Sequence, residues 1–262
     1  MTIKTFKKNP NLKNCFISNG KREIQELKKY VKEEYNVNNL LDRFGANTKL
    51  KKSSKGIYNV AGLSLMPSLS FCPMSKKAGC FDLCLKSAGR GKFNNVVNAR
   101  NNKSNLYNND YEIFIKLLVS ELQLHVTNCK KNKVNPSARL NVLSDIPYEN
   151  TFIFDLFEEI YFYDYTKRAN RLEACNKIKN YKLMFSYSGK QEYQKQVNQA
   201  LQFDNPIAVV FKNEFPKTFL NRPVFDGDLS DIDNSTKDNY IIALKAKGSL
   251  ARNSFNNFVV NN

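Results

Sequence analysis

Short apolar segments alternate with helical segments through the second half of the chain, and this alternation constrains the fold more than any other feature. Strand-like segments are predicted at Ser137–Leu143, Ile160–Tyr165, Tyr181–Ser186, Pro206–Lys212, Pro223–Phe225 and Tyr240–Lys245. Helical segments at Thr151–Glu159, Ala169–Lys179 and Gln191–Phe203 separate the earlier strands. Strands joined by helices of this length lie parallel in one sheet, so the sequence predicts an α/β fold.

A further strand is predicted earlier, at about Ile57–Leu65, where apolar, β-branched and aromatic residues alternate. About seven parallel strands can curl into a complete or partial (β/α) barrel, which is the predicted architecture, and an open doubly wound sheet is the alternative. No glycine fingerprint of the Rossmann or P-loop type follows any of these strands. The sequence therefore does not indicate a dinucleotide-binding or Walker-type site.

Three helices are predicted outside that alternation. Apolar residues recur at helical spacing from Arg22 to Tyr35, and a mixed helical stretch covers Asn94 to Tyr107. A stronger helix is predicted from Asp110, its N-cap, to about Asn128. Its core face is expected to hold Phe114, Leu117, Leu118, Leu122 and Leu124, with Lys116 and Glu121 towards water.

A polar connector, RFGANTKLKKSSKG at residues 43–56, suggests a domain boundary. We expect a basic, helical N-terminal appendage over residues 1–55 and a barrel-like core domain over residues 56–262. An apolar content of 42%, with 19 Phe and 13 Tyr, is ample for a hydrophobic core. No apolar run is long enough to cross a membrane, and the first residues lack the apolar core of a signal peptide, so we expect a protein without membrane contact whose cysteines are reduced.

The formal net charge of +17 predicts affinity for anions, of which nucleic acid is the obvious polymer. Lys and Asn are abundant while Trp is absent, a pattern that an AT-rich genome also imposes on its proteins. A nucleic-acid surface and codon composition therefore remain two explanations of the charge. The single histidine, His125, lies in an apolar-periodic helix as a packing or surface residue, and its count excludes a site with several histidines.

Three cysteines lie within thirteen residues of the loop predicted after the first strand. Cys72, Cys80 and Cys84 stand in FCPMSKKAGCFDLCLKSAGRG, residues 71–91, and the last two are one helical turn apart. Three such thiols suit ligation of zinc or an iron–sulfur cluster better than a disulfide, which would leave one thiol over. A distant cysteine, Cys15, Cys129 or Cys175, would have to close a four-ligand zinc site. The alternative is that the thiols pack as small hydrophobic groups.

Polar side chains gather where the predicted strands end. In a (β/α) barrel the carboxyl ends of the strands form the rim where ligands bind, and the cysteine loop would reach the same rim. Catalytic acids, bases or charge-stabilising groups are expected among Asp145, Asp226, Asp228, Lys245 and Lys247. The groups expected to bind substrate or cofactor are Arg139, Asn141, Asp164, Lys167, Ser186, Ser188 and Lys212.

Six motifs follow one another between about Tyr58 and the C-terminus: the cysteine loop, RLNVLSDIPYE, FYDYTKRANR, FSYSG, AVVFKNEFPKTFLNRPVFDGD and ALKAKG. Their succession resembles the bacteriophage gene 88 protein family. The resemblance implies a phage or prophage origin, and hence the cytoplasm of an infected host cell. It implies no particular chemistry.

A strand that runs into a three-cysteine loop and then into a partial barrel is also similar to the radical S-adenosylmethionine enzymes. In that superfamily three thiolates hold a [4Fe–4S] cluster whose remaining iron binds S-adenosylmethionine. The similarity implies that Cys72, Cys80 and Cys84 ligate the cluster, with Asn141 and Asp145 on the ribose or amino group. The spacing departs from that pattern, because the cysteines here are separated by seven and then three residues.

These features lead to three functional hypotheses. The first is a metal- or cluster-dependent barrel enzyme acting on a small anionic molecule or a nucleotide. The second is a nucleic-acid-binding or processing protein of phage DNA replication, with structural cysteines. The third is a phage interaction protein without chemistry.

Overall fold

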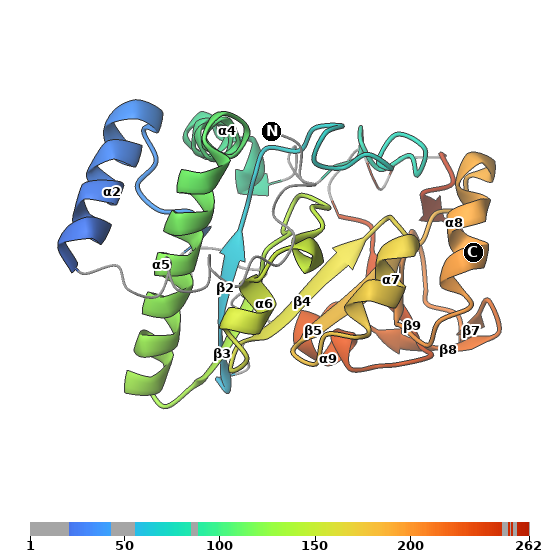
Figure 1. The fold of residues 1–262 in the computed structure, drawn as a ribbon. Helices are drawn as coiled ribbons and strands as arrows, with labels where there is room; N and C mark the ends of the chain where they lie inside the picture. Colours follow the sequence, from blue (N-terminus) through green and yellow to red (C-terminus); the bar gives the residue numbers. More distant parts are fainter. Residues whose placement is uncertain are drawn as a thin grey trace.

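A ten-stranded, mostly parallel sheet runs through the protein (Figure 1). This computed structural model describes residues 21–42, 56–84, 89–247, 251, 253 and 256–261. The sheet order is β1-β2-β3-β4-β5-β6-β9-β8-β7, and β10 pairs with β6. The strands are β1 (Leu41–Asp42), β2 (Tyr58–Leu63), β3 (Asn135–Arg139), β4 (Tyr161–Thr166), β5 (Tyr181–Ser186), β6 (Ile207–Phe211), β7 (Thr218–Phe219), β8 (Arg222–Asp226), β9 (Ile241–Lys245) and β10 (Val259–Val260).

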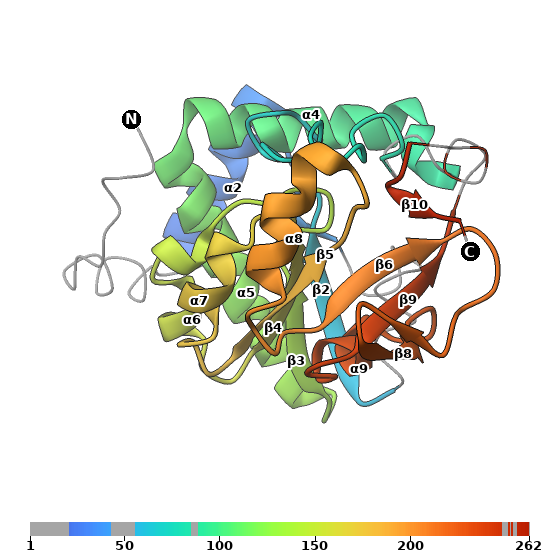
Figure 2. The same ribbon diagram turned by 90° about the vertical axis from the view of Figure 1, so that its right-hand side faces the viewer.

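Strands β2 to β6 follow one another in chain order, all parallel, with helices packed on one face (Figure 2). The helices of this face are α5 (Tyr111–Lys131), α6 (Ile153–Leu156), α7 (Asn170–Cys175) and α8 (Gln194–Ala200). A doubly wound sheet would reverse its strand order near the middle, and this stretch has no reversal. The predicted parallel α/β class is thus confirmed. The sheet is open in the described residues, with β1 and β7 at its ends, so a barrel remains a prediction.

One short helix, α9 (Asp231–Ser235), lies on the opposite face of the sheet. Strand β9 is inserted between β6 and β8, so the connection from β8 to β9 runs backwards across the sheet. Right-handed crossovers that run in opposite directions place their helices on opposite faces. Accordingly, Ile232 of α9 packs with Val60, Tyr163 and Met184, away from α7 and α8.

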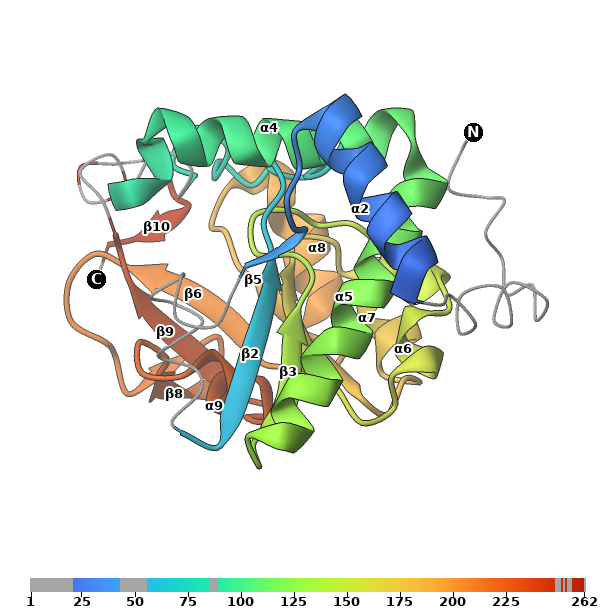
Figure 3. The same ribbon diagram turned by 90° about the vertical axis from the view of Figure 1, so that its left-hand side faces the viewer.

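Helix α2 (Lys21–Tyr35) confirms the predicted amphipathic helix and packs against α4 (Asn94–Asn109) and α5 (Figure 3). Its Val31 is fully buried in the main core, and β1 pairs with β2. Residues 21–42 therefore share their core with the sheet domain. The connector proposed as a domain boundary, residues 43–55, lies outside the described residues.

Helix α5 corrects two predictions about its faces. Leu124 is 51% exposed rather than packed, while Glu121, expected to face water, is only 7% exposed. The segment after α2 crosses α5 here, and its buried backbone N–H groups need an acceptor. Glu121 supplies that acceptor, taking hydrogen bonds from Leu40 N at 3.0 Å and Leu41 N at 2.8 Å.

The start of α5 also differs from its prediction. Asp110 precedes the helix but makes no capping hydrogen bond, and its carboxylate instead accepts one from the Tyr30 hydroxyl of α2 at 3.2 Å. Three short 3₁₀ helices complete the described structure: η3 (Gly89–Lys92), η4 (Tyr148–Asn150) and η5 (Gln191–Tyr193). Within the described ranges, no helix combines the length and the apolar character that crossing a bilayer requires.

Candidate functional site

Lys167 follows β4 directly and occupies the carboxyl edge of the sheet beside β5. Its Nζ donates to the Ser186 hydroxyl at 2.7 Å and to the carbonyl oxygens of Ser186 and Tyr187 at 3.1 and 3.4 Å. The ring of Phe258 lies 4.4 Å from the same nitrogen. Burial lowers the pKa of Lys167, and the negative charge of Asp145 opposes that shift. The three acceptors fix the amino group at the strand ends.

The cysteine loop lies against this lysine. Its three thiols are half-buried; Cys72 Sγ donates to Leu143 O at 3.5 Å, and Cys80 Sγ donates to Ser75 O at 3.6 Å. Burial, with a smaller effect from the charge of Asp145, raises the pKa of Cys72 to about 12. Burial also raises the pKa of Cys80, against the opposing charge of Lys167. Both groups are therefore thiols, not thiolates, in this arrangement.

These thiols do not form a ready metal centre. Across the ranges that the structure describes, no three His, Cys, Asp or Glu side chains are grouped so that they could hold a metal ion. Cys72 and Cys80 instead turn towards backbone carbonyls. Cys129 and Cys175 are buried in α5 and α7, and Cys15 lies outside the described residues. The zinc or iron–sulfur interpretation therefore stays a prediction that the geometry does not support.

Arg100 of α4 provides a second cation near the loop. It is half-buried, and its guanidinium donates to Gly91 O at 3.1 Å. Burial lowers the pKa of Arg100, while the charge of Asp42 opposes that shift. Gly91 ends the stretch 71–91 that holds the three cysteines, so Arg100 is bonded to one end of that stretch.

Asp145, predicted as catalytic, is 4% exposed and holds the end of β4. It accepts hydrogen bonds from Thr166 Oγ1 at 2.8 Å and from Lys167 N at 3.0 Å. It also pairs with Arg171, whose guanidinium forms a second ion pair with Glu149. With its oxygens taken by these donors, Asp145 positions Lys167 in this structure.

Asn141 and Asp164 join β3 and β4 where the backbone pairing stops after Ala138 and Phe162. Asp164 accepts from Asn141 N at 2.8 Å and from Asn141 Nδ2 at 3.1 Å. Burial raises the pKa of Asp164 to about 6, against the lowering effects of Arg139 and the Asn141 hydrogen bond. Both side chains are buried and fully engaged within the protein.

Arg139, predicted to bind substrate, extends towards α9. Its Nη1 lies 2.9 Å from Asp231 Oδ2, and its guanidinium stacks over the Tyr165 ring at 4.7 Å. Arg139 is 4% exposed, so its charge is used to hold α9 on the sheet.

The remaining predicted residues divide between two places. Ser186 binds Lys167, and buried Ser188 accepts from Lys190 N at 3.3 Å, so both lie near the cysteine loop. Asp228 instead pairs with Lys247 at 2.7 Å and accepts from Lys245 N at 3.1 Å. Asp226 is exposed at the end of β8 and accepts a hydrogen bond from Asp228 N at 3.0 Å. Lys212 follows β6, where its N–H donates to Val260 O at 3.0 Å.

Residues 256–260, here called the C-terminal strap, cover the rim and were not foreseen from the sequence. Asn256 Nδ2 donates to Gly79 O at 2.7 Å, and Asn257 O accepts from Gly189 N at 2.8 Å. Phe258 then covers Lys167. The strap ends in β10, beside β6 (Figure 2). A two-residue strand has too few positions to show a periodic pattern, so no sequence signal marks it.

Gly79 is required by this closure. Its φ of +73° lies in the left-handed region, and a Cβ built there would stand 2.8 Å from Lys190 Cδ and 3.2 Å from Asn256 Nδ2. Glycine lets the cysteine loop, Lys190 and the strap meet at one point. The rim therefore combines thiols, fixed cations and backbone carbonyls.

Comparisons with known proteins give one family. A search of curated proteins found no match, and neither did a search of solved structures. No comparison supports the similarity to radical S-adenosylmethionine enzymes. A family model described as gene product 88 matches residues 38–261, a span that runs from just before β1 through β10 and contains the whole rim. The chain therefore belongs to the gene product 88 family of phage proteins.

Proposed function

We propose that the protein is an enzyme acting on a small anionic molecule or a nucleotide at the carboxyl edge of β4 and β5. One observation carries the proposal: two half-buried basic side chains are held by backbone carbonyls, Lys167 at the strand ends and Arg100 at Gly91, the last residue of the cysteine-loop stretch. A cation fixed in a poorly hydrated position attracts an anion more strongly than a mobile surface lysine does. The two sides of a phosphate-bearing substrate would thus meet positive groups.

Several side chains have roles in this proposal. Lys167 binds the substrate anion. Asp145 positions Lys167 by accepting a hydrogen bond from the backbone N–H of Lys167. Lys190, beside Gly79, adds a positive group at the mouth of the rim. The thiols of Cys72 and Cys80 are the candidate reacting or ligating groups.

The proposal of a cofactor is independent of the proposed binding of an anionic substrate. Zinc or an iron–sulfur cluster, the latter with S-adenosylmethionine, would need the two thiols to turn away from Leu143 O and Ser75 O and to lose their protons. Elemental analysis of anaerobically purified wild-type protein and of Cys72→Ser tests it, because joint ligation predicts that the substitution removes most of the metal.

The substrate-binding part is tested by calorimetry with nucleotides and inorganic phosphate. We expect Lys167→Met to weaken binding at least about tenfold, since it removes the central charge. Lys179→Met is the matched control, because Lys179 is exposed and lies just before β5, at the opposite edge of the parallel strands from their carboxyl ends. Equal affinities in the two variants would refute the site.

Nucleic-acid binding is the second candidate, favoured by the net charge of +17 and by exposed Lys76 and Lys77 on the cysteine loop. Phosphate contacts make such binding fall steeply with salt. The double variant Lys76→Ala/Lys77→Ala should reduce the salt slope of single-stranded DNA binding by about two. A salt-independent or undetectable interaction would remove this candidate.

A further inference from the structure

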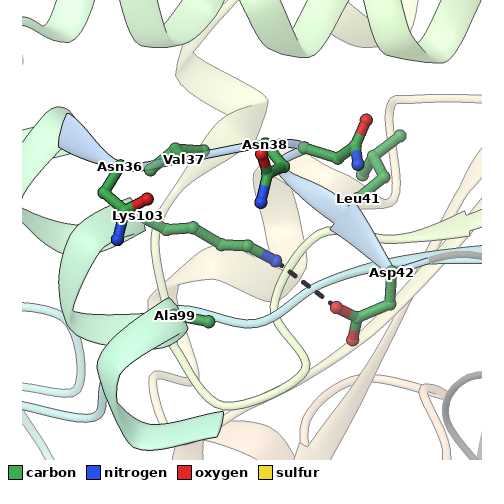
Figure 4. A pocket seen from close by; sticks show the side chains of 8 residues that line it. Asn36, Val37, Asn38, Leu41, Asp42, Ala99 and Lys103 are labelled. Carbon is green, nitrogen blue, oxygen red and sulfur yellow. Dashed lines mark hydrogen bonds and ion pairs between the residues drawn. The ribbon is translucent and has the colours of Figure 1, made fainter. Parts of the chain in front are cut away.

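A cavity of about 250 Å³ lies between the segment after α2 and the first half of α4, outside the rim site (Figure 4). Its lining residues are Asn36, Val37, Asn38, Asn39, Leu41, Asp42, Ala99 and Lys103. In Figure 4 the Lys103 side chain runs along the cavity towards Asp42, with Val37 and Asn38 on one side and Ala99 on the other. The cavity is thus bounded by one ion pair, several amides and three apolar side chains.

Two polar groups of this cavity, Lys103 and Asp42, are held by contacts within the protein. Lys103 is 8% exposed; its Nζ donates to Leu40 O at 2.7 Å and approaches Asp42 Oδ1 at 3.4 Å. The other carboxylate oxygen of Asp42 accepts from Ser64 Oγ at 3.0 Å. Glu121 of α5 accepts a hydrogen bond from Leu40 N and so fixes the backbone of Leu40. A donor and an acceptor are therefore presented side by side, in fixed positions.

This combination selects a class of ligand. The charges of Lys103 and Asp42 cancel, so the cavity favours a neutral molecule over a phosphate. The apolar side chains of Val37, Leu41 and Ala99 suit the faces of a flat ring. The volume is below the roughly 300–1,000 Å³ of pockets for drug-sized ligands, so the occupant is smaller. Lys, Asn and Asp side chains are also those that read the hydrogen-bonding edges of bases.

We propose that this cavity binds a nucleobase, with Lys103 donating to a ring acceptor and Asp42 accepting from an adjacent N–H. The geometry extends to a phosphate-bearing form of the ligand. Arg100 follows the lining residue Ala99 on α4, and its guanidinium donates to Gly91 O, at the end of the cysteine-loop stretch, at 3.1 Å. A base in the cavity would therefore have a basic side chain one residue along the helix from its lining.

The test uses the full-length protein and nucleosides, which carry no phosphate and so do not depend on Lys167. Equilibrium dialysis with each nucleoside, each 5′-monophosphate and a short single-stranded oligonucleotide should detect binding of at least one base. Ala99→Leu should weaken it at least about tenfold, because the larger side chain enters the cavity from an exposed helix position and leaves the ion pair intact. Asn98→Leu, the neighbouring exposed position outside the lining, is the matched control.

The outcomes separate this inference from the rim proposal. Nucleoside binding that Ala99→Leu abolishes and Lys167→Met preserves supports the cavity even if the rim binds nothing. If only the oligonucleotide binds, and Ala99→Leu abolishes that binding, the base recognised belongs to a nucleic-acid strand. If free nucleosides bind, the ligand is a small molecule. The inference is overturned if no base binds in any form, or if Ala99→Leu binds as well as Asn98→Leu.

Discussion

Replacing Glu121 by Ala should strongly destabilise the protein, although the helical periodicity of the sequence predicts that Glu121 faces water. The substitution leaves two buried N–H groups, those of Leu40 and Leu41, without their acceptor. Each unsatisfied buried donor costs about 1–3 kcal/mol, which sums to about 2–6 kcal/mol. Removing a buried carboxylate offsets part of this cost, since burial raises the pKa of Glu121. The expected loss in the free energy of unfolding is about 2–4 kcal/mol.

Urea denaturation followed by circular dichroism measures this loss. With a slope near 3 kcal/mol per molar urea for a chain of this size, a loss of 3 kcal/mol lowers the midpoint by about 1 M. Glu112→Ala is the control on the same helix, because Glu112 is exposed and makes only an i,i+4 ion pair with Lys116 at 2.8 Å. That control should cost at most about 0.5 kcal/mol. Midpoints for the two variants within about 0.2 M of each other would refute the acceptor role of Glu121.

The pH dependence of the same comparison has a definite sign. Because the folded-state pKa of Glu121 is raised, its contribution to stability is complete below the pKa of the unfolded chain and declines as the pH rises through the folded pKa. The difference between wild type and Glu121→Ala should therefore be larger in mild acid than at neutral pH. A difference that grows with pH would contradict the burial argument.

Three further predictions concern the core, the strand junction and the rim. Leu118→Ala should lower the free energy of unfolding by about 2–5 kcal/mol, because Leu118 is fully buried. Leu124→Ala, at an exposed position, should lower it by less than about 0.5 kcal/mol. Equal urea midpoints for the two variants would contradict the observed faces of α5. The pKa of Asp164 is raised to about 6, so this residue should contribute stability below pH 4 that is lost as the pH rises through about 6. The substitution Asp164→Asn should therefore flatten the pH profile of Tm across that interval. Parallel profiles for wild type and variant would contradict the raised pKa. Phe258→Ala should speed the reaction of Cys72 and Cys80 with a thiol reagent several-fold. Phe225→Ala is the control and should leave the rate unchanged, because the Phe225 ring contacts Lys237 and not Lys167. Equal rates in the two variants would mean that the strap does not shield the cysteine loop.

The strands were predictable where side-chain alternation extends over the whole element. Tyr181–Ser186 is β5 residue for residue, because every second side chain enters the helix-covered core. The strand predicted to reach Leu143 ends at Arg139 instead, since Asn141 leaves the ladder to bond Asp164. The helices predicted over Thr151–Glu159 and Ala169–Lys179 are shorter in the structure, at α6 and α7. Elements of two to five residues, such as β1 and α9, are too short to carry a period.

The site was predictable only as far as parallel topology dictates it. Parallel strands place all their carboxyl ends on one edge, which is why Lys167 and Ser186, predicted separately, meet there. Nothing in the local sequence indicates that Arg100 donates to Gly91 O or that Phe258 covers Lys167. Conversely, Asp145 and Arg139 satisfied the expectation for strand-end polar groups and yet serve buried ion pairs. A polar residue at a strand end does not reveal whether its partner is a ligand or another part of the chain.

The C-terminal strap has a consequence for the order in which the protein folds and opens. Its hydrogen bond from Asn256 to Gly79 joins residues 177 positions apart. Closing a loop of that length costs about 4–5 kcal/mol of chain entropy, more than a few hydrogen bonds of about 1 kcal/mol return. The strap can therefore dock only after the sheet has brought its anchor points together, and amide exchange at Gly189 and Lys212 should precede exchange within β4 and β5. For an interval in each folding event, and in each brief native-state opening, the molecule holds the sheet from β1 to β9 while β10 and the rim are still unassembled.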